Sequence, residues 1–361
     1  MSASLQINIP GPTESKMIRI PLIILLSWLI PFHSITPRSL DETDQPILRV
    51  APGQRYVAWI VPANPDQWKL VILTAELRPI ASTNLGFNRI ESVTWQTDGR
   101  SLMVTDIHGG IREYSFESEV LALRNEIKLS HWIAADSVHI GKHWYLALVD
   151  RKTNRKSALG ILDPSGKGPQ KIIPDAAPEG FQVRPYLRIH RVSTDQERRY
   201  SVFIGSPGFF RVVPIDAPKQ GYEISAGSGP LDIFEGYGIA DNRIVVCLVF
   251  GECSEYEPGK PETQNRFRLP GVRSLKTIAI DDANIFWIEY RKKSLMGLLQ
   301  RSGTRDFRAC KLPGEPKALA RVDNKIVLGY PSGTLTSVEI RKIADASINS
   351  DCSVLDRYVP E

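Results

Sequence analysis

Short apolar runs separated by turn residues fill the chain from about Ile47 onward. Each run covers about four to eight residues, and apolar and polar positions alternate with a period of two far more often than with a period of 3.6. A period of two is typical of β-strands, and Gly, Pro, Asp, Asn and Ser are the usual turn residues between strands. Only IRKIADASINS, close to the C-terminus, has the pattern of a short helix. Because no crossover helices separate the strands, the sequence predicts antiparallel sheets joined by tight turns.

One stretch shows the unit from which these sheets are built. ESVTWQTDGRSLMVTDIHGGIREYSF, from Glu91 to Phe116, contains three apolar runs separated by a D-G turn and a G-G turn. A fourth run follows at Glu119 to Asn125, so the unit is a four-stranded meander. Weaker copies lie at Ile278 to Gly303 and Pro316 to Ile340, with centres roughly 40 residues apart.

A repeated four-stranded unit of this size predicts a β-propeller. A single meander exposes both of its faces, whereas several arranged around an axis bury each face against a neighbour. The length of the region after residue 46 predicts an all-β chain with one propeller of seven blades, with six as the next choice. Closure requires Ile47 to Val61 to pair with or lie beside Leu335 to Ile340. A β-sandwich is the alternative fold, although it rarely needs so many short strands.

The same stretches carry a family resemblance. VTWQTDGRSLMVTDIHGGIREYSF resembles a blade of the bacterial TolB and WD40-like propeller superfamily, and IAIDDANIFWIEY is similar to the corresponding part of YWTD-type and NHL-type propellers. The family pattern Trp-Ser-Pro-Asp-Gly is replaced here by Trp95, Gln96, Thr97, Asp98 and Gly99. The resemblance implies a propeller that acts as a binding platform more often than as an enzyme.

The N-terminus has the pattern of an export signal. Lys16 and Arg19 precede an apolar run, Ile20 to Phe32, that is short for a membrane span but suits the core of a signal peptide. A start at Met17 would make the first sixteen residues an over-extension. Because HSITPRS is a weak cleavage site, an uncleaved N-terminal anchor is the alternative, and it would be the only contact with a membrane. We therefore expect a periplasmic, extracellular or cell-envelope protein, with a leader at 1–36, a linker at 37–46, the propeller at 47–345 and a C-terminal tail at 346–361.

The four cysteines fit an exported protein. Cys247 and Cys253 are six positions apart and can form a disulfide if Gly251 bends the chain, while Cys310 and Cys352 can join late elements. Three pairings are open, and four unlinked buried thiols are the alternative. No pair has the C-x-x-C spacing of redox or zinc sites.

Composition and charge narrow the classes of partner. Apolar residues make up 42% and charged residues 24% of the chain, which is typical of a globular protein. The net charge of +5 arises from 45 basic and 40 acidic residues without a basic block, so we predict no nucleic-acid partner. Neither a G-x-S-x-G elbow nor a phosphate-binding loop occurs.

Candidate metal ligands fall in two patterns. His139 and His143 would point to the same side if they shared one strand, whereas a turn at Gly141 and Lys142 would separate them. Asp106, Asp281 and Asp282 occur in acidic turns that could hold Ca²⁺ in a propeller channel, but aspartate is also a default turn residue. We favour the turn interpretation and predict no other cofactor.

The sequence favours binding over catalysis. The polar stretch Gly251 to Arg268 is a candidate recognition loop, with a tolerated surface insertion as the alternative. We expect an exported, non-catalytic propeller whose loop-lined face binds a protein or peptide through exposed aromatic residues and arginines. The alternative is a propeller enzyme, a lactonase or other metal-dependent hydrolase, with carboxylates converging in the channel. No catalytic residue is predicted.

Overall fold

The computed structural model describes most of the chain after the predicted leader and linker. It covers residues 47–360 apart from 65–66, 87–88, 154–155, 163–168, 175–188, 195–197, 206–208, 216, 218–219, 226–233, 241–242, 258–259, 261, 263–264, 282, 291–293 and 301–306. The described residues belong to one compact unit, Asp44–Glu361. The predicted leader at 1–36 and linker at 37–46 lie outside them.

The described strands form seven four-stranded antiparallel sheets, each made of strands consecutive in the sequence. The first sheet contains β1 (Ile47–Val50), β2 (Tyr56–Asn64), β3 (Gln67–Thr74) and β4 (Pro79–Gly86). The second contains β5 (Ile90–Trp95), β6 (Ser101–Asp106), β7 (Gly110–Glu117) and β8 (Val120–Lys128). The third contains β9 (Trp132–Ile140), β10 (His143–Asp150), β11 (Ser157–Leu162) and β12 (Pro169–Pro174).

The remaining sheets repeat this order. The fourth contains β13 (Ile189–Thr194), β14 (Arg198–Gly205), β15 (Phe209–Pro214) and β16 (Tyr222–Ser225), and the fifth β17 (Phe234–Ala240), β18 (Arg243–Leu248), β19 (Glu252–Tyr256) and β20 (Asn265–Arg268). The sixth contains β21 (Leu275–Ile280), β22 (Asn284–Tyr290), β23 (Ser294–Gln300) and β24 (Phe307–Lys311). The last contains β25 (Ala318–Val322), β26 (Lys325–Gly329), β27 (Leu335–Glu339) and β28 (Val354–Tyr358), with the short helix α2 (Ile340–Ala344) after β27.

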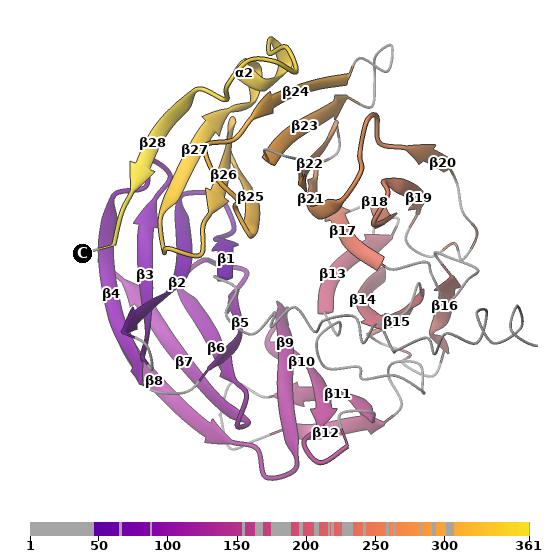
Figure 1. Cartoon of the computed structure of the whole chain (residues 1–361). Coiled ribbons are helices and arrows are strands. Elements are labelled where there is room, and N and C mark those ends of the chain that lie inside the picture. The colour runs from indigo at the N-terminus through magenta and orange to yellow at the C-terminus, as the bar shows by residue number, and fades with distance from the viewer. Residues whose placement is uncertain are drawn as a thin grey trace, which may run out of the picture. The chain divides into compact units, whose positions relative to one another are not determined.

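These sheets form a closed ring. The first strand of each sheet contacts the first strand of the next, from β1 through β5, β9, β13, β17 and β21 to β25, and β25 contacts β1. Figure 1 shows these strands nearest the centre and the fourth strands on the outside. A ring of four-stranded antiparallel sheets around a central axis is a β-propeller, so this part of the prediction is confirmed.

The hydrophobic core lies between neighbouring sheets, because both faces of each sheet are covered. One cluster joins the first two sheets through side chains such as Ile60, Leu70 and Val93. Another joins the last sheet to the first through Trp59 and Leu335. The alternation of exposed and half-buried positions in an outer strand such as β8 follows from its exposure to solvent on the rim.

The ring closes by side-chain packing, because the first and last sheets share no strand. The N-terminal strands lie beside the last sheet, as predicted, with the Trp59 indole N–H donating to the carbonyl oxygen of Gly333 at 2.8 Å. The last sheet continues past residue 345, where the sequence analysis predicted the end of the propeller. Because β28 pairs with β27, residues 354–358 belong to the propeller and not to a separate tail.

Candidate functional site

The two histidines singled out by the sequence do not share a strand. His139 lies near the end of β9 and His143 begins β10, with a turn between them in which Gly141 has a φ of 65°. Across the hairpin, His139 pairs with Trp144 and His143 with Ile140. The interpretation that placed both imidazoles at i and i+4 of one strand is wrong, because the turn reverses the chain between them.

The His139 side chain connects the second and third sheets. The residue is 4% exposed, and its Nδ1 atom lies 3.4 Å from the backbone nitrogen and 3.1 Å from the hydroxyl of Thr97. Its Nε2 atom lies 3.2 Å from the Gln96 side-chain nitrogen. Burial lowers the pKa of His139, an effect that the Asp98 carboxylate opposes and His143 reinforces. The imidazole therefore favours its neutral form, which can accept the Thr97 N–H.

Asp106 stabilises the turn between β6 and β7. Its Oδ1 atom accepts hydrogen bonds from the backbone N–H groups of His108 and Gly110, both at 2.8 Å. A Cβ atom at Gly110 would overlap Oδ2 of Asp106, so only glycine fits there without moving the carboxylate. The carboxylate thus has the turn role that the sequence analysis favoured.

Asp281 has a similar role after β21. Its Oδ1 atom accepts hydrogen bonds from the backbone N–H groups of Ala283 and Asn284, at 2.7 and 2.8 Å, and its Oδ2 atom forms an ion pair with Arg321. Asp282 lies outside the described residues. Among the residues that the structure describes, no three His, Cys, Asp or Glu side chains gather where they could hold a metal ion.

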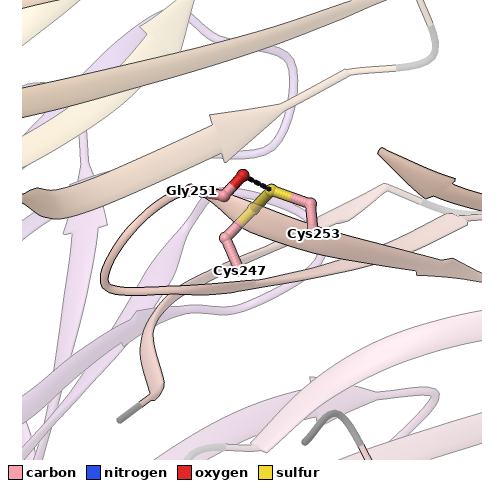
Figure 2. The surroundings of a disulfide bond; sticks show 3 residues. All are labelled: Cys247, Gly251 and Cys253. Carbon is pink, nitrogen blue, oxygen red and sulfur yellow. Dashed lines mark hydrogen bonds between the residues drawn. A yellow bond between two sulfur atoms is a disulfide. The ribbon is translucent and has the colours of Figure 1, made fainter. Parts of the chain in front are cut away.

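Both cysteine pairs are joined as disulfides, Cys247 to Cys253 and Cys310 to Cys352. The first pair links directly opposite positions of β18 and β19. Figure 2 shows this disulfide beside the turn residue Gly251, whose carbonyl oxygen lies 3.5 Å from Cys253 Sγ. Gly251 has a φ of 78° and bends the chain between the two strands.

Half of the polar stretch Gly251 to Arg268 forms two paired strands, so it is not a single long loop. It contains β19 and β20, which pair in register from Glu252 with Arg268 to Glu255 with Asn265. Its polarity follows from the position of β20 on the outer edge of the fifth sheet, where most of its residues are exposed. The connecting residues are fewer than the sequence suggested.

A pocket that the sequence analysis did not identify lies between the first two sheets. We call it the turn-side pocket, because it is formed by the β1–β2, β5–β6 and β7–β8 turns, and its volume is about 740 Å³. Its lining includes Arg55, Tyr56, Asp98, Arg100, Phe116 and Glu119.

The floor of the turn-side pocket is aromatic. Phe116 is 5% exposed, and the rings of Tyr56 and Trp95 pack edge-on against it with centroids 5.0 and 6.0 Å away. The Phe116 ring is thus held in place by aromatic rings from two other strands.

The rim of the pocket is charged. Two exposed arginines, Arg55 and Arg100, and three exposed carboxylates surround the aromatic floor: Asp98, Glu117 and Glu119. Neither of these guanidinium groups has an ion-pair partner in the described part of the chain. The Arg100 backbone N–H donates to Asp98 Oδ1 at 2.8 Å, which fixes the D-G turn that presents this side chain. An apolar floor with arginines and carboxylates on its rim can bind an apolar side chain of a partner together with charged groups beside it.

Left-handed backbone positions shape the same pocket. Ser118 and Glu119, the two residues of the β7–β8 turn, have φ values of 52° and 63°, and Gln54 in the β1–β2 turn has 57°. Two consecutive positive φ values are the requirement of a type I′ hairpin turn, for which Asn-Gly is the usual sequence. This chain has Ser-Glu at these positions, so its sequence did not predict the type of this turn.

Comparisons with known proteins identify the fold. The β-propeller domain of Cps50 (Swd1) from Myceliophteria thermophila is similar over 78% of this chain and 91% of that one, with 10% identity and a TM-score of 0.59. The C-terminal WD40 domain of Sif2 is similar over 88% of this chain and 90% of that one, with 15% identity and a TM-score of 0.55. BamB from Moraxella catarrhalis is similar over 88% of both chains, with 11% identity and a TM-score of 0.51.

The chain is a β-propeller. At these identities the likeness concerns the fold alone, and it includes WD40 propellers. No family model and no curated protein matches the sequence. In the described part of the propeller, no helix is long and apolar enough to span a membrane.

Proposed function

We propose that this chain is an exported, non-catalytic β-propeller, with all seven sheets as its blades, that binds a protein or peptide partner at the turn-side pocket. The observation that carries the proposal is the combination in one pocket of the buried Phe116 ring, the Tyr56 ring and the exposed Arg55 and Arg100 side chains. Tyrosine and arginine are the residues most often found, with tryptophan, among the strong contacts of protein interfaces.

The geometry suits a partner side chain better than a free metabolite. The pocket is bounded by hairpin turns on the surface, and its charged groups lie on the rim. A partner's apolar side chain would cover Phe116 and Tyr56, while neighbouring carboxylates would contact Arg55 and Arg100. Because the aromatic floor and the turns are already formed, little ordering would oppose binding.

Export is supported by the two disulfides, which are typical of oxidising compartments. We also propose that the chain belongs with the TolB and WD40-like propellers of the cell envelope. Support for this comes from Trp95, Asp98 and Gly99 in the second sheet, at the positions where these families carry their blade motif.

Affinity capture from the native source with the full chain tests the proposal. The test variant is Arg55→Glu with Arg100→Glu, and the matched control is Lys128→Glu with Arg266→Glu, which makes the same charge change at exposed sites on the outer strands β8 and β20. We expect a partner that is retained by the wild type and the control and lost, by at least about tenfold in affinity, by the test variant.

Binding of the purified partner to each variant then gives the affinities by calorimetry. If the proteins recovered do not differ between the test variant and the control, or if the purified partner binds both equally, the turn-side pocket is not the binding site. Near-ultraviolet circular dichroism on each variant establishes that the aromatic floor is intact.

A further inference from the structure

A second groove lies on the outside of the ring, where the last sheet meets the first. It runs between the outer strands β4 and β28, which Figure 1 shows side by side, and its volume is about 820 Å³. We call it the seam groove. Between the first and second sheets, the corresponding outer strands β4 and β8 contact each other. The first and second sheets are therefore closer together at the rim than the last and first sheets are.

The strand β28 forms the outer edge of the last sheet, and no other strand of the described residues pairs with its outer side. The backbone N–H of Asp356 points toward β27, because it donates to the hydroxyl of Ser337 at 3.2 Å. Successive N–H groups along a strand point to opposite sides. A bulge opposite Ser337 interrupts this alternation, because Leu355 and Asp356 together face that one residue of β27. The N–H groups of β28 that point away from β27, toward the open edge, are those of Val354 and Arg357.

The side chains around this edge are apolar and unusually exposed. Leu355 is 49% exposed and Val359 is 55% exposed. Edge strands of stable proteins are ordinarily protected by lysine, proline or a covering segment. By contrast, β4 on the opposite side of the groove begins with Pro79, which has no N–H to donate. Of the two strands, β28 is the better template for an additional strand.

The charges of the seam groove select the kind of segment that would bind. Lys69, Arg78 and Arg357 line it, and none of them has an ion-pair partner in the described part of the chain. The carboxylate of Asp356 is already bound to the ammonium group of Lys325 and the hydroxyl of Ser337, both at 2.8 Å. Glu76 is the remaining acidic residue of the lining. The groove thus presents cations to an incoming segment.

We propose that the seam groove is a docking site for an extended, acidic segment of a partner protein, which adds to the edge of β28 as a further strand. The segment's backbone carbonyls would accept from the N–H groups of Val354 and Arg357. Its alternate apolar side chains would cover Leu355 and Val359, and its carboxylates would contact Lys69, Arg78 and Arg357. This surface is separate from the turn-side pocket, so either proposal can fail without the other.

Synthetic peptides test the proposal on the full chain. The probe is a peptide of about nine residues in which glutamate alternates with valine, a length typical of a strand pairing with an edge. A peptide with lysine in place of glutamate is its control. Binding is measured by fluorescence anisotropy, and hydrogen exchange of the segment containing Val354 and Arg357 is followed by mass spectrometry.

We expect the glutamate peptide to bind and to slow exchange at this segment, and the lysine peptide to bind at least about tenfold more weakly. Lys69→Glu, Arg78→Glu and Arg357→Glu together should weaken binding of the glutamate peptide by a similar factor. The control Lys128→Glu with Arg266→Glu, and the pocket variant Arg55→Glu with Arg100→Glu, should leave it unchanged.

The backbone part of the proposal has its own variant. Val354→Pro removes an N–H that points to the open edge, and proline is tolerated as the first residue of an edge strand. It should abolish the slowed exchange and weaken binding of the peptide. Absence of binding by the glutamate peptide, equal binding of the lysine peptide, or binding without slowed exchange at 354–357 would each overturn the proposal.

Discussion

The contact between the last and first sheets and the contact between the second and third sheets each bury an apolar cluster, but they differ in the polar contacts beside it. At the first of these, which we call the seam, Trp59 and Leu335 belong to one buried apolar cluster, and the indole of Trp59 donates to Gly333. Between the second and third sheets, the Thr94 hydroxyl donates to the carbonyl oxygen of Ser137 at 2.9 Å, and His139 contacts Thr97.

The two contacts also differ in the path of the chain. The second and third sheets are consecutive, so a short connection adds to the apolar packing of Met103 against Trp144 and Leu146. The last and first sheets are joined by no short connection and share no strand. Their association depends on burial of apolar area, which is the larger and less directional source of stability.

The largest effect is expected at Trp59. Trp59→Ala removes a fully buried indole from the seam and should lower the free energy of unfolding by about 3–5 kcal/mol, measured by urea titration. Trp59→Phe should cost less, because it mainly removes the hydrogen bond to Gly333. Phe250→Ala, at a side chain that is 58% exposed, is the control and should change stability by less than about 0.5 kcal/mol. A loss at Trp59 no larger than that of the control would show that apolar packing does not close the ring.

The disulfide between Cys310 and Cys352 is expected to have the next largest effect. It spans 42 positions against 6 for Cys247 and Cys253, and the segment that it anchors leads into β28 at the seam. Alanine at both Cys310 and Cys352 should lower stability by about 4 kcal/mol, and alanine at both Cys247 and Cys253 by about 2 kcal/mol, from loop-closure entropy alone. Thermal unfolding of the two variants under identical conditions gives the comparison. If the variant without Cys247 and Cys253 lost more stability, local packing around that disulfide would contribute more than the length of the loop it closes.

Gly329 tests how tightly the seam is packed. A Cβ atom at Gly329 would overlap Cη2 of Trp59, so Gly329→Ala should cost about 1–3 kcal/mol through overpacking. In a Trp59→Phe background the same substitution should cost less, because the smaller ring lacks the clashing atoms. Equal costs in both backgrounds, measured by a double-mutant cycle, would contradict the direct contact.

The smallest effect concerns pH and the contact between the second and third sheets. Because burial lowers the pKa of His139 in the folded state, the unfolded chain binds more protons as pH falls below the ordinary value of 6.5. Stability from this residue is therefore complete above that value and declines below it. His139→Gln should reduce the loss of stability as pH falls from the ordinary pKa of histidine to the lower pKa of His139 in the folded protein. Urea titrations at a series of pH values measure it, and an unchanged slope would exclude His139 as its source.

Local structure could be predicted from the sequence where turn residues are distinctive. The D-G turn at Asp98 and Gly99 and the G-G turn ending at Gly110 lie where the pattern placed them, because positive φ values or close contacts there require glycine. The propeller fold followed from the repeated meander. The role of Asp106 as a turn residue was likewise predictable from its position before Gly109 and Gly110.

The candidate sites could not be predicted in the same way. The spacing of His139 and His143 fits a period of two, and only the hairpin register shows that they belong to different strands. The turn-side pocket combines residues from three turns, 52–56, 98–100 and 116–119, which have no common motif. Its Ser118 and Glu119 turn adopts left-handed angles that neither residue type predicts.

The sequence by itself determined the strands, most turns and the need for neighbouring sheets to cover one another, because alternation and glycine positions act over a few residues. Only the tertiary structure decided which cysteines pair, where the ring closes and which side chains share a pocket or a groove. Those features join residues far apart in the chain, such as Trp59 with Gly333 and Asp281 with Arg321. These residues are close together only because the ring closes, and no pattern within a short stretch of sequence predicts it.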